Sequence, residues 1–192
     1  MKKPSPKAKK LLRKHLLLVI TGSIAAYKIG DLIERLREEG ARVTCVMTES
    51  AKQFVTPLVL RAISGERVYH EFFAVDTPYS VLHTSLAEES DLVLVAPASA
   101  DFMARLAAGM AGDLASCIIL ATRKPVILVP AMNDNMYTHP ITQQNREKLL
   151  RVGYKFVDPV EGHLVCGKEA IGHISEPDAV VSAVSRFLSS KK

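Results

Sequence analysis

The sequence lacks the features that would place it in a membrane or in the secretory pathway. No apolar run approaches the roughly 20 residues that a membrane helix needs. The basic N-terminus is not followed by the apolar segment and the small-residue cleavage site of a secretory signal. We therefore expect a protein without a membrane partner.

Cysteine is scarce: the chain has three, an odd number without the spacing of a zinc site. This count predicts a reducing compartment, the cytoplasm, and no metal centre. Cys45 and Cys117 lie among apolar neighbours, which is typical of small core residues. Cys166 differs, because the segment GHLVCGKEAIG surrounds it with glycines and polar residues, where a thiol can meet a ligand.

Acidic residues are missing from the first 14 positions, which carry seven of the 25 Lys and Arg residues. The remaining chain has 18 basic and 20 acidic residues, so the net charge of +5 belongs to the N-terminus and not to a basic binding face. We expect no nucleic-acid partner. Residues 1–14 are predicted to be a disordered basic arm, with docking to an acidic partner as the alternative, and residues 15–192 one folded domain.

The sequence does contain a repeated alternation of apolar, strand-like runs with segments of helical spacing. Such repeats predict parallel strands joined by right-handed crossovers. The expected fold class is a single α/β domain, a doubly wound parallel sheet with helices on both faces. The expected strands are 16–21, 42–48, 67–72, 91–98, 125–131 and 154–159, and the expected helices follow residue 24, begin at Pro57, span 101–110, 113–122 and 138–153, and start after Glu176-Pro177.

Ligands of such sheets bind beyond the carboxyl ends of the strands, where the strand order reverses. Three loops are therefore of interest: TGSIAAYK after the first expected strand, PASADF after the fourth and PAMNDNMY after the fifth. Backbone N–H groups and the Ser23 hydroxyl can hold a phosphate, although a Gly-Ser turn is as typical of a plain strand–helix connection. A GxGxxG fingerprint is absent, and the second strand ends at Thr48 instead of at an acid. A mononucleotide therefore fits better than a dinucleotide.

His83, in SVLHTSLAEES, stands at the expected start of a short helix that leads into the fourth strand. It is either a helix-start or surface histidine, or an acid–base group beside the crevice. The pattern alone leaves both interpretations open.

Five segments occur in the order typical of one known family. They are GSIAAYK, VMTESAKQFVTPL, LHTSLAEESDLVLVAPASADFMARLAAGMAGDL, PAMNDNMY and GHLVCGKEAIGHISEP, and they extend from about Leu16 to the last expected helix. On these segments the chain resembles the homo-oligomeric flavin-containing cysteine decarboxylases. The combination of PAMNxxMY with GxLxCG is a specific pair.

The resemblance implies a Rossmann-like fold of the flavoprotein type, FMN as cofactor, and a homo-oligomer, a trimer or one built from trimers. The implied activity is decarboxylation of 4'-phosphopantothenoylcysteine to 4'-phosphopantetheine in coenzyme A biosynthesis, by a chain without the synthetase domain often fused to this activity. In the implied chemistry FMN oxidises the C–S unit to a thioaldehyde, and CO₂ leaves with its charge delocalised onto sulfur. Re-reduction by the flavin and a proton donor then gives the thiol.

The resemblance also implies the site residues, position by position. Asn133 matches the residue that holds the substrate carboxylate, His83 matches the active-site histidine, and Cys166 matches the proton donor on a flap over the substrate. Backbone groups of His163, Leu164 and Val165 would line that flap. Residues at the FMN-binding positions are Gly22, Ser23, Ile24, Thr48, Glu49, Ser50, Ser99, Ala100, Asp101, Phe102 and Ala131.

The chain departs from the family pattern at the end of the flap. The family usually has Gly-Arg-Met there, whereas this sequence has Gly172-His173-Ile174 and so loses a fixed cation with two donors.

Two alternative functions remain on the same fold: decarboxylation of a C-terminal peptidyl cysteine, and a flavin-binding regulatory subunit without catalysis. The Cys166 flap favours the small substrate over the peptide. The joint presence of His83, Asn133 and Cys166 argues against a purely binding role.

Overall fold

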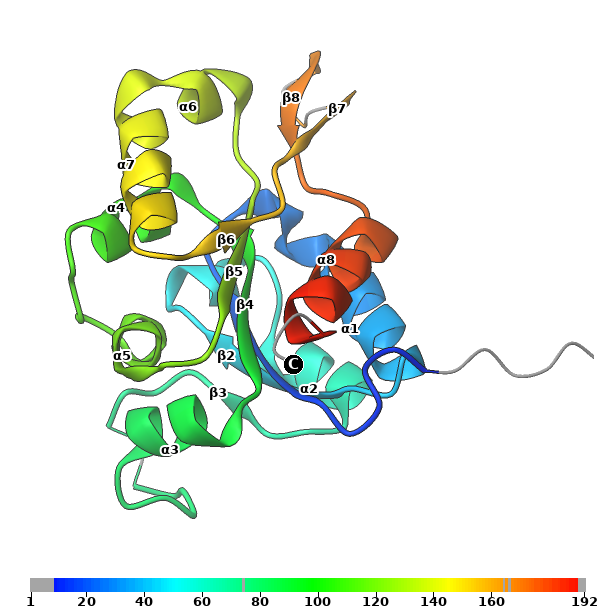
Figure 1. Cartoon of the computed structure of the whole chain (residues 1–192), viewed down its shortest axis with the longest axis vertical. Helices are drawn as coiled ribbons and strands as arrows, with labels where there is room; N and C mark the ends of the chain where they lie inside the picture. The colour runs from blue at the N-terminus through cyan, green and yellow to red at the C-terminus, as the bar shows by residue number, and fades with distance from the viewer. Residues whose placement is uncertain (1–8, 74, 164, 166, 190–192) are drawn as a thin grey trace, which may run out of the picture.

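A parallel six-stranded sheet forms the centre of the molecule (Figure 1). The computed structural model describes residues 9–73, 75–163, 165 and 167–189. Neighbouring strands have the order β3-β2-β1-β4-β5-β6, and β1 pairs with both β2 and β4, so the strand order reverses there. The predicted doubly wound sheet is confirmed. The strands are β1 (His15–Ile20), β2 (Arg42–Met47), β3 (Val68–Tyr69), β4 (Leu92–Ala98), β5 (Val126–Pro130) and β6 (Lys155–Phe156).

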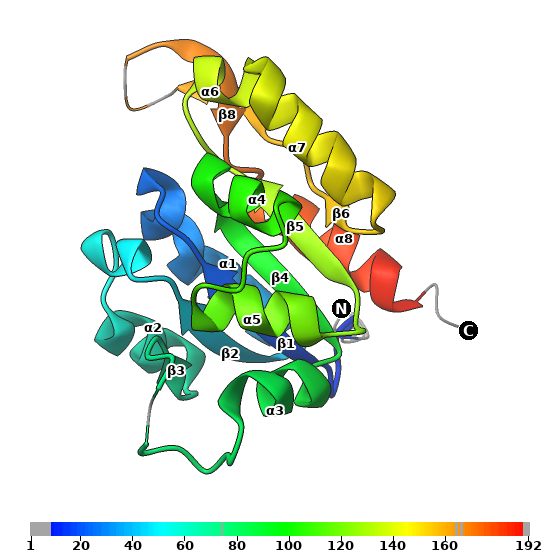
Figure 2. The ribbon, with the colours of Figure 1, turned by 90° about the vertical axis from the view of Figure 1, so that its left-hand side faces the viewer.

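Helices cover both faces of the sheet, as Figures 1 and 2 show. In β1, Leu16, Leu18 and Ile20 face one layer of helices while Leu17 and Val19 face the other, the alternation of a strand buried on both sides. Among the described helices, none is both long and apolar enough to cross a bilayer. The first layer contains α1 (Ile29–Glu38), α2 (Pro57–Ser64) and α8 (Pro177–Ser189), and the second contains α3 (Leu82–Glu89), α4 (Ala100–Ala107), α5 (Leu114–Ala121) and α7 (Pro140–Arg151).

Local sequence signals fix where several helices begin and end. The Thr56 hydroxyl accepts the Val59 N–H at the start of α2, and Gly65 ends that helix with a left-handed φ of 71°. Asp113 and Ser116 form a capping box at the start of α5. These signals explain why the starts of α2 and α5 could be predicted from the sequence.

The structure also contains elements that the sequence pattern did not predict. The segment predicted to be a flap belongs to an antiparallel hairpin of β7 (Val160–His163) and β8 (Glu169–His173). A short helix, α6 (Asp134–Thr138), follows β5. Two 3₁₀ helices, η1 (Ile24–Lys28) and η2 (Ser50–Gln53), follow β1 and β2. β3 and β6 have only two residues each and are much shorter than expected.

The folded domain begins before residue 15, which corrects the predicted boundary of the N-terminal arm. Leu11 is fully buried in the core, and its N–H donates to the Glu39 carbonyl over 2.9 Å. The Lys10 N–H donates to the Glu39 carboxylate over 3.0 Å. An apolar side chain within the basic segment therefore anchors it to the end of α1. Of the predicted arm, residues 1–8 lie outside the described residues.

Candidate active site

The loops after β1 and β4 are joined at the point where the strand order reverses. The Thr21 hydroxyl donates to the Pro97 carbonyl over 2.6 Å and accepts the Ser99 N–H over 2.9 Å. Thr21 is fully buried, so this link is shielded from water. Ser99 then caps α4 by accepting the Phe102 N–H over 3.2 Å. The arrangement places the start of α4, with its backbone donors, beside the β1 loop.

The loop after β2 approaches the same place closely. A Cβ atom on Gly22 would lie 2.5 Å from the Ser50 hydroxyl, so only glycine fits at this contact. The Ser50 and Thr48 hydroxyls are 3.2 Å apart. Glu49 instead points to solvent and pairs with Lys52 over 2.7 Å. Of the predicted second loop, Thr48 is buried, the exposed Ser50 keeps its hydroxyl against Thr48 and Gly22, and Glu49 pairs only with Lys52.

Two predicted residues of the third loop have other partners. The Phe102 side chain is fully buried in the core, and its N–H already donates to Ser99, which leaves Phe102 a packing role. Asp101 is an exposed partner of Arg105 at 3.0 Å, and Arg105 also pairs with Asp113 at 2.6 Å. These ion pairs stabilise the packing of α4 against α5. Of the predicted third loop, Ser99 and the adjacent Ala100 are nearest to the β1 loop.

A cavity of about 170 Å³ lies beneath the β7–β8 hairpin, between η1 and the loop after β5. The Ser23 hydroxyl donates to the Ala131 carbonyl over 2.9 Å and so ties the first of these loops to the second. The structure thus brings the first and fifth predicted loops together with the predicted flap. The residues lining the cavity are Ser23, Ile24, Ala25, Tyr27, Lys28, Ala131, Met132, Asn133, His163, Val165, Gly172, His173 and Ile174.

The hairpin is fixed against the loop after β5 by a backbone contact. The Met132 N–H donates to the Gly172 carbonyl over 3.1 Å. Gly172 has a φ of 130°, and a Cβ there would lie 2.2 Å from the Met132 carbonyl oxygen. Glycine is therefore required for β8 to lie this close to the loop.

Asn133 lines the cavity and caps α6. Its side-chain carbonyl accepts the Asn135 N–H over 3.0 Å. This bond fixes the orientation of the amide, whose NH₂ group is the part that can donate to an anion.

Asp158 holds the root of the hairpin against the helices that follow β5. Its carboxylate accepts two bonds of 2.8 Å from Arg146 of α7 and one of 3.2 Å from the Tyr137 hydroxyl of α6. Its carbonyl accepts the Ser175 hydroxyl over 2.6 Å. Burial, and then the Asp158 charge, raise the pKa of Tyr137, so that its hydroxyl remains a donor. These residues were not predicted as part of the site.

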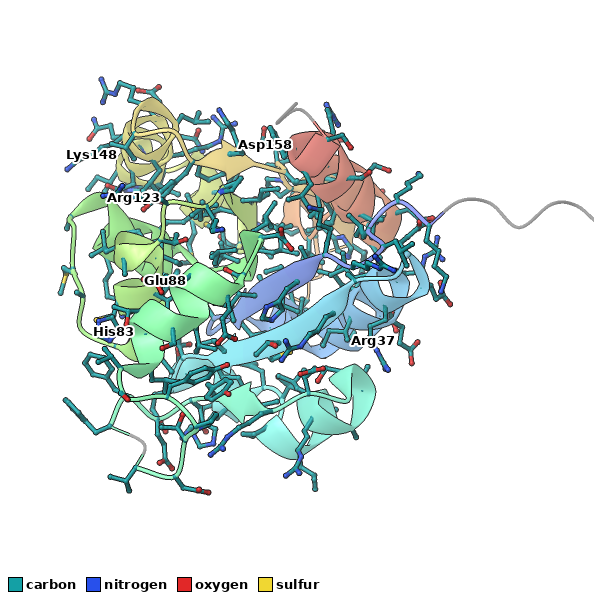
Figure 3. The ribbon with its side chains drawn as sticks, turned by 60° about the horizontal axis from the view of Figure 1, so that its bottom comes forward. Arg37, His83, Glu88, Arg123, Lys148 and Asp158 are labelled. Carbon is teal, nitrogen blue, oxygen red and sulfur yellow. The ribbon has the colours of Figure 1, made fainter. Side chains whose placement is uncertain are left out.

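The three predicted catalytic residues are not all found in this cavity. Asn133 lines it, and so do His163 and Val165 from the predicted flap, whereas Leu164 and Cys166 lie outside the described residues. His83 is at the start of α3, where its ring lies 6.3 Å from that of Phe72 in an edge arrangement. Figure 3 shows His83 well apart from Asp158 at the root of the hairpin. Within one chain, His83 does not line the cavity.

Several cavity residues were missed by the sequence interpretation. Lys28 and His173 are the notable ones, although both stand in segments that were quoted, GSIAAYK and the departure Gly172-His173-Ile174. No signal in the sequence indicated that they meet. Among the described residues no group of three or more His, Cys, Asp and Glu side chains could hold a metal ion.

The reversed strand order, the hydroxyl-bearing loops at its carboxyl edge and the cavity beneath a hairpin define a doubly wound α/β protein with a binding edge of mononucleotide type. The chain belongs to the flavoprotein family, whose model matches residues 4–189. It is 46% identical over 183 residues to the coenzyme A biosynthesis bifunctional protein CoaBC of Haemophilus influenzae, which covers 95% of this chain and 46% of that protein. The chain thus spans about half the length of the curated relatives it matches.

Solved structures agree with this family. A PPC decarboxylase mutant complexed with pantothenoylaminoethenethiol matches with a TM-score of 0.83 and 31% identity, covering 92% of this chain and 98% of that one. The FMN-dependent cysteine decarboxylase SpaF matches with a TM-score of 0.82 and 27% identity, covering 94% and 98%. The resemblance to flavin-containing cysteine decarboxylases is confirmed.

Proposed function

We propose that this chain is an FMN-dependent carboxy-lyase that converts 4'-phosphopantothenoylcysteine to 4'-phosphopantetheine in coenzyme A biosynthesis. The observation that carries the proposal is the cavity, because it brings Asn133 beneath a hairpin and beside the loop that holds Ser23. The similarity to CoaBC and to a PPC decarboxylase over nearly the whole chain supports the same substrate.

The residues at the carboxyl edge of the sheet fit FMN. A phosphate would be held by the Ser50 and Ser99 hydroxyls near the capped start of α4. The Ser23 hydroxyl donates to the Ala131 carbonyl and so holds the neighbouring loop in place. Ala131, a small residue behind the cavity, allows a flat ring to approach the backbone. When bound, the flavin would supply the oxidation of the cysteine-derived unit and the return of the electron pair.

The part played by the protein is to bind, orient and protonate. Asn133 would donate to the substrate carboxylate without adding a charge, so the carboxylate is held but not stabilised as strongly as by a cation. The hairpin would cover the substrate and exclude water, and its contact through Gly172 keeps it close to Asn133. We assign to Cys166, by the resemblance, the proton delivered when the enethiol is reduced.

A catalytic role for His83 requires a second chain, because His83 does not line the cavity of its own chain. We therefore propose a homo-oligomer, a trimer or an assembly of trimers, in which His83 of one copy completes the cavity of another. Exposed apolar side chains near His83, such as Phe73 and Val81, support an interface on this side.

We also propose a cytoplasmic location. Cys45 is buried, and burial raises the pKa of its thiol to about 12, which suits a structural thiol in a reducing compartment. Cys117 is half-buried, with its thiol donating to the Ala111 carbonyl over 3.3 Å.

The function is tested with the purified, flavin-loaded chain. We expect a yellow flavin spectrum, and loss of CO₂ from 4'-phosphopantothenoylcysteine detected by mass spectrometry. A peptide ending in cysteine is the matched alternative substrate. Turnover of the peptide alone would assign the chain to the peptidyl class, and bound flavin without turnover of either substrate would support the regulatory alternative.

A further inference from the structure

The cavity has an unbalanced charge. Its thirteen lining residues include Lys28, His163 and His173 but no Asp or Glu. None of the ion pairs formed by the described residues includes Lys28. Asp31 and Glu176 line a neighbouring hollow with Lys28, yet neither pairs with it. A cation without an acidic partner at the wall of a cavity favours an anionic ligand.

Lys28 is nevertheless held in one position. Its Nζ lies 2.8 Å from Nε2 of His173, and Nδ1 of His173 lies 2.9 Å from the Ile174 carbonyl. An ammonium group can only donate and a carbonyl can only accept. Both contacts are satisfied by the tautomer of His173 that donates from Nδ1 to the Ile174 carbonyl and accepts at Nε2 from Lys28.

The backbone fixes this histidine in turn. Gly172, which precedes it, lies against the Met132 carbonyl, and the Ile174 side chain that follows is buried. Lys28 ends η1 and is 145 residues away from His173 in the sequence. The Tyr27 ring lies 5.9 Å from the Lys28 Nζ and adds a weak cation–π contact.

We propose that Lys28 binds an anionic group of the substrate, and that His173 is a positioning residue that holds the Lys28 ammonium at the cavity wall. One of the three ammonium donors goes to His173, and two can go to the oxygens of a carboxylate or a phosphate. The family usually has an arginine at the position of His173. In this chain His173 instead accepts a hydrogen bond from Lys28 and so orients the lysine. The proposal rests on the proposed function for the identity of the substrate.

The proposed substrate has a carboxylate and a phosphate, and three compounds distinguish between them. These are 4'-phosphopantothenoylcysteine, its dephosphorylated form, and the product 4'-phosphopantetheine, which has no carboxylate. If Lys28 binds the phosphate, Lys28→Met weakens the binding of the substrate and of the product but not that of the dephosphorylated substrate. If Lys28 binds the carboxylate, Lys28→Met weakens the binding of both substrates and leaves the binding of the product unchanged. Both comparisons are double-mutant cycles between the lysine and the anion.

Lys28→Met should raise KM on the order of ten- to a hundredfold, the loss of a charge-assisted hydrogen bond, with a smaller change in kcat. Lys28→Arg should retain most of the affinity. His173→Phe should raise KM in the same direction, and His173→Gln, whose carbonyl can accept from Lys28, should restore part of it. Lys148→Met on the exposed face of α7 is the matched control for loss of one charge (Figure 3).

A second measurement is independent of the reaction. Inorganic phosphate is titrated into the flavin-loaded wild type, Lys28→Met and Lys148→Met, and the thermal unfolding midpoint is recorded. We expect phosphate to raise the midpoint of the wild type and of Lys148→Met more than that of Lys28→Met. Equal shifts in all three, together with an unchanged KM for Lys28→Met, would overturn the proposal. Absence of turnover by the wild type would count against the proposed function alone.

Discussion

Asn133 shows how one amide can be prepared for an anion. The bond from the Asn135 N–H engages its carbonyl oxygen, so the side chain cannot flip to present that oxygen to a carboxylate. Asn133→Asp replaces the donors with a negative charge. We expect kcat to fall on the order of a hundredfold or more while flavin remains bound. Asn135→Asp, which changes the neighbouring exposed amide in the same way, is the control and should retain turnover.

Gly172 is required by sterics and by backbone conformation together, and these two causes can be separated. Gly172→Ala brings a Cβ to 2.2 Å from the Met132 carbonyl and also strains a φ of 130°. Gly153→Ala strains a φ of 100° with no atom within 4 Å of the new Cβ. We expect each to lose about 1–3 kcal/mol of unfolding free energy from backbone strain. Only Gly172→Ala should also lose turnover, and equal activity in the two variants would show that the hairpin tolerates displacement.

At the scale of elements, His15 joins three of them through one buried ring. It lies in β1, its Nε2 is 2.9 Å from the Thr44 hydroxyl of β2, and its Nδ1 is 3.0 Å from the Glu89 carbonyl of α3. Burial lowers the pKa of His15 below its usual 6.5 in the folded chain. The unfolded state then binds more protons between these two pKa values, so the folded state loses stability as the pH falls below about 6.5.

This pH dependence can be measured by chemical denaturation between pH 7 and pH 5. We expect the unfolding free energy of the wild type to fall over this range. That of His15→Gln should fall less steeply, because the variant has no histidine at this position to take up a proton more readily in the unfolded chain than in the folded one. Identical slopes would assign the acid sensitivity to other groups.

The elements that could be predicted from the sequence are those with a strong local pattern. The buried runs of β1, β4 and β5 and the capped helix α5 were expected close to their observed bounds, and the start of α2 was expected at Pro57. The β7–β8 hairpin was missed because its residues show no apolar alternation. It is defined by the pairing of its two strands and by contacts with distant segments, such as that with Met132. The expected third strand was too long, since its pairing with β2 ends at Tyr69.

The candidate site shows the same division. The loops after β1, β4 and β5 could be located because the topology of a parallel sheet brings the carboxyl ends of its strands to one edge. The Lys28–His173 contact could not be predicted, because it depends on how the β7–β8 hairpin packs against η1, which is 145 residues away in the sequence. Residues 1–14 were assigned to the arm because of their basic charge, and the buried Leu11 within them was not recognised as a core residue.

At the scale of the whole molecule, His83 does not line the cavity of its own chain, so the catalytic role that we propose for it would need a second chain. His83→Asn and Asn133→Asp should each be inactive on their own. In mixed oligomers of the two, refolded together or produced together, some cavities combine a wild-type Asn133 with a wild-type His83 from another copy. Random mixing gives about a quarter of the cavities both residues in a symmetric homo-oligomer.

We therefore expect the mixture to recover about a quarter of the wild-type kcat per chain, measured as release of CO₂ at saturating substrate. Mixtures of Asn133→Asp with Cys166→Ser test the opposite case. If Cys166 acts in the same cavity and the same chain as Asn133, complementation between those two variants fails because no single chain has both groups intact. Recovery by that pair, or none by the pair with His83→Asn, would contradict the division of the site between chains.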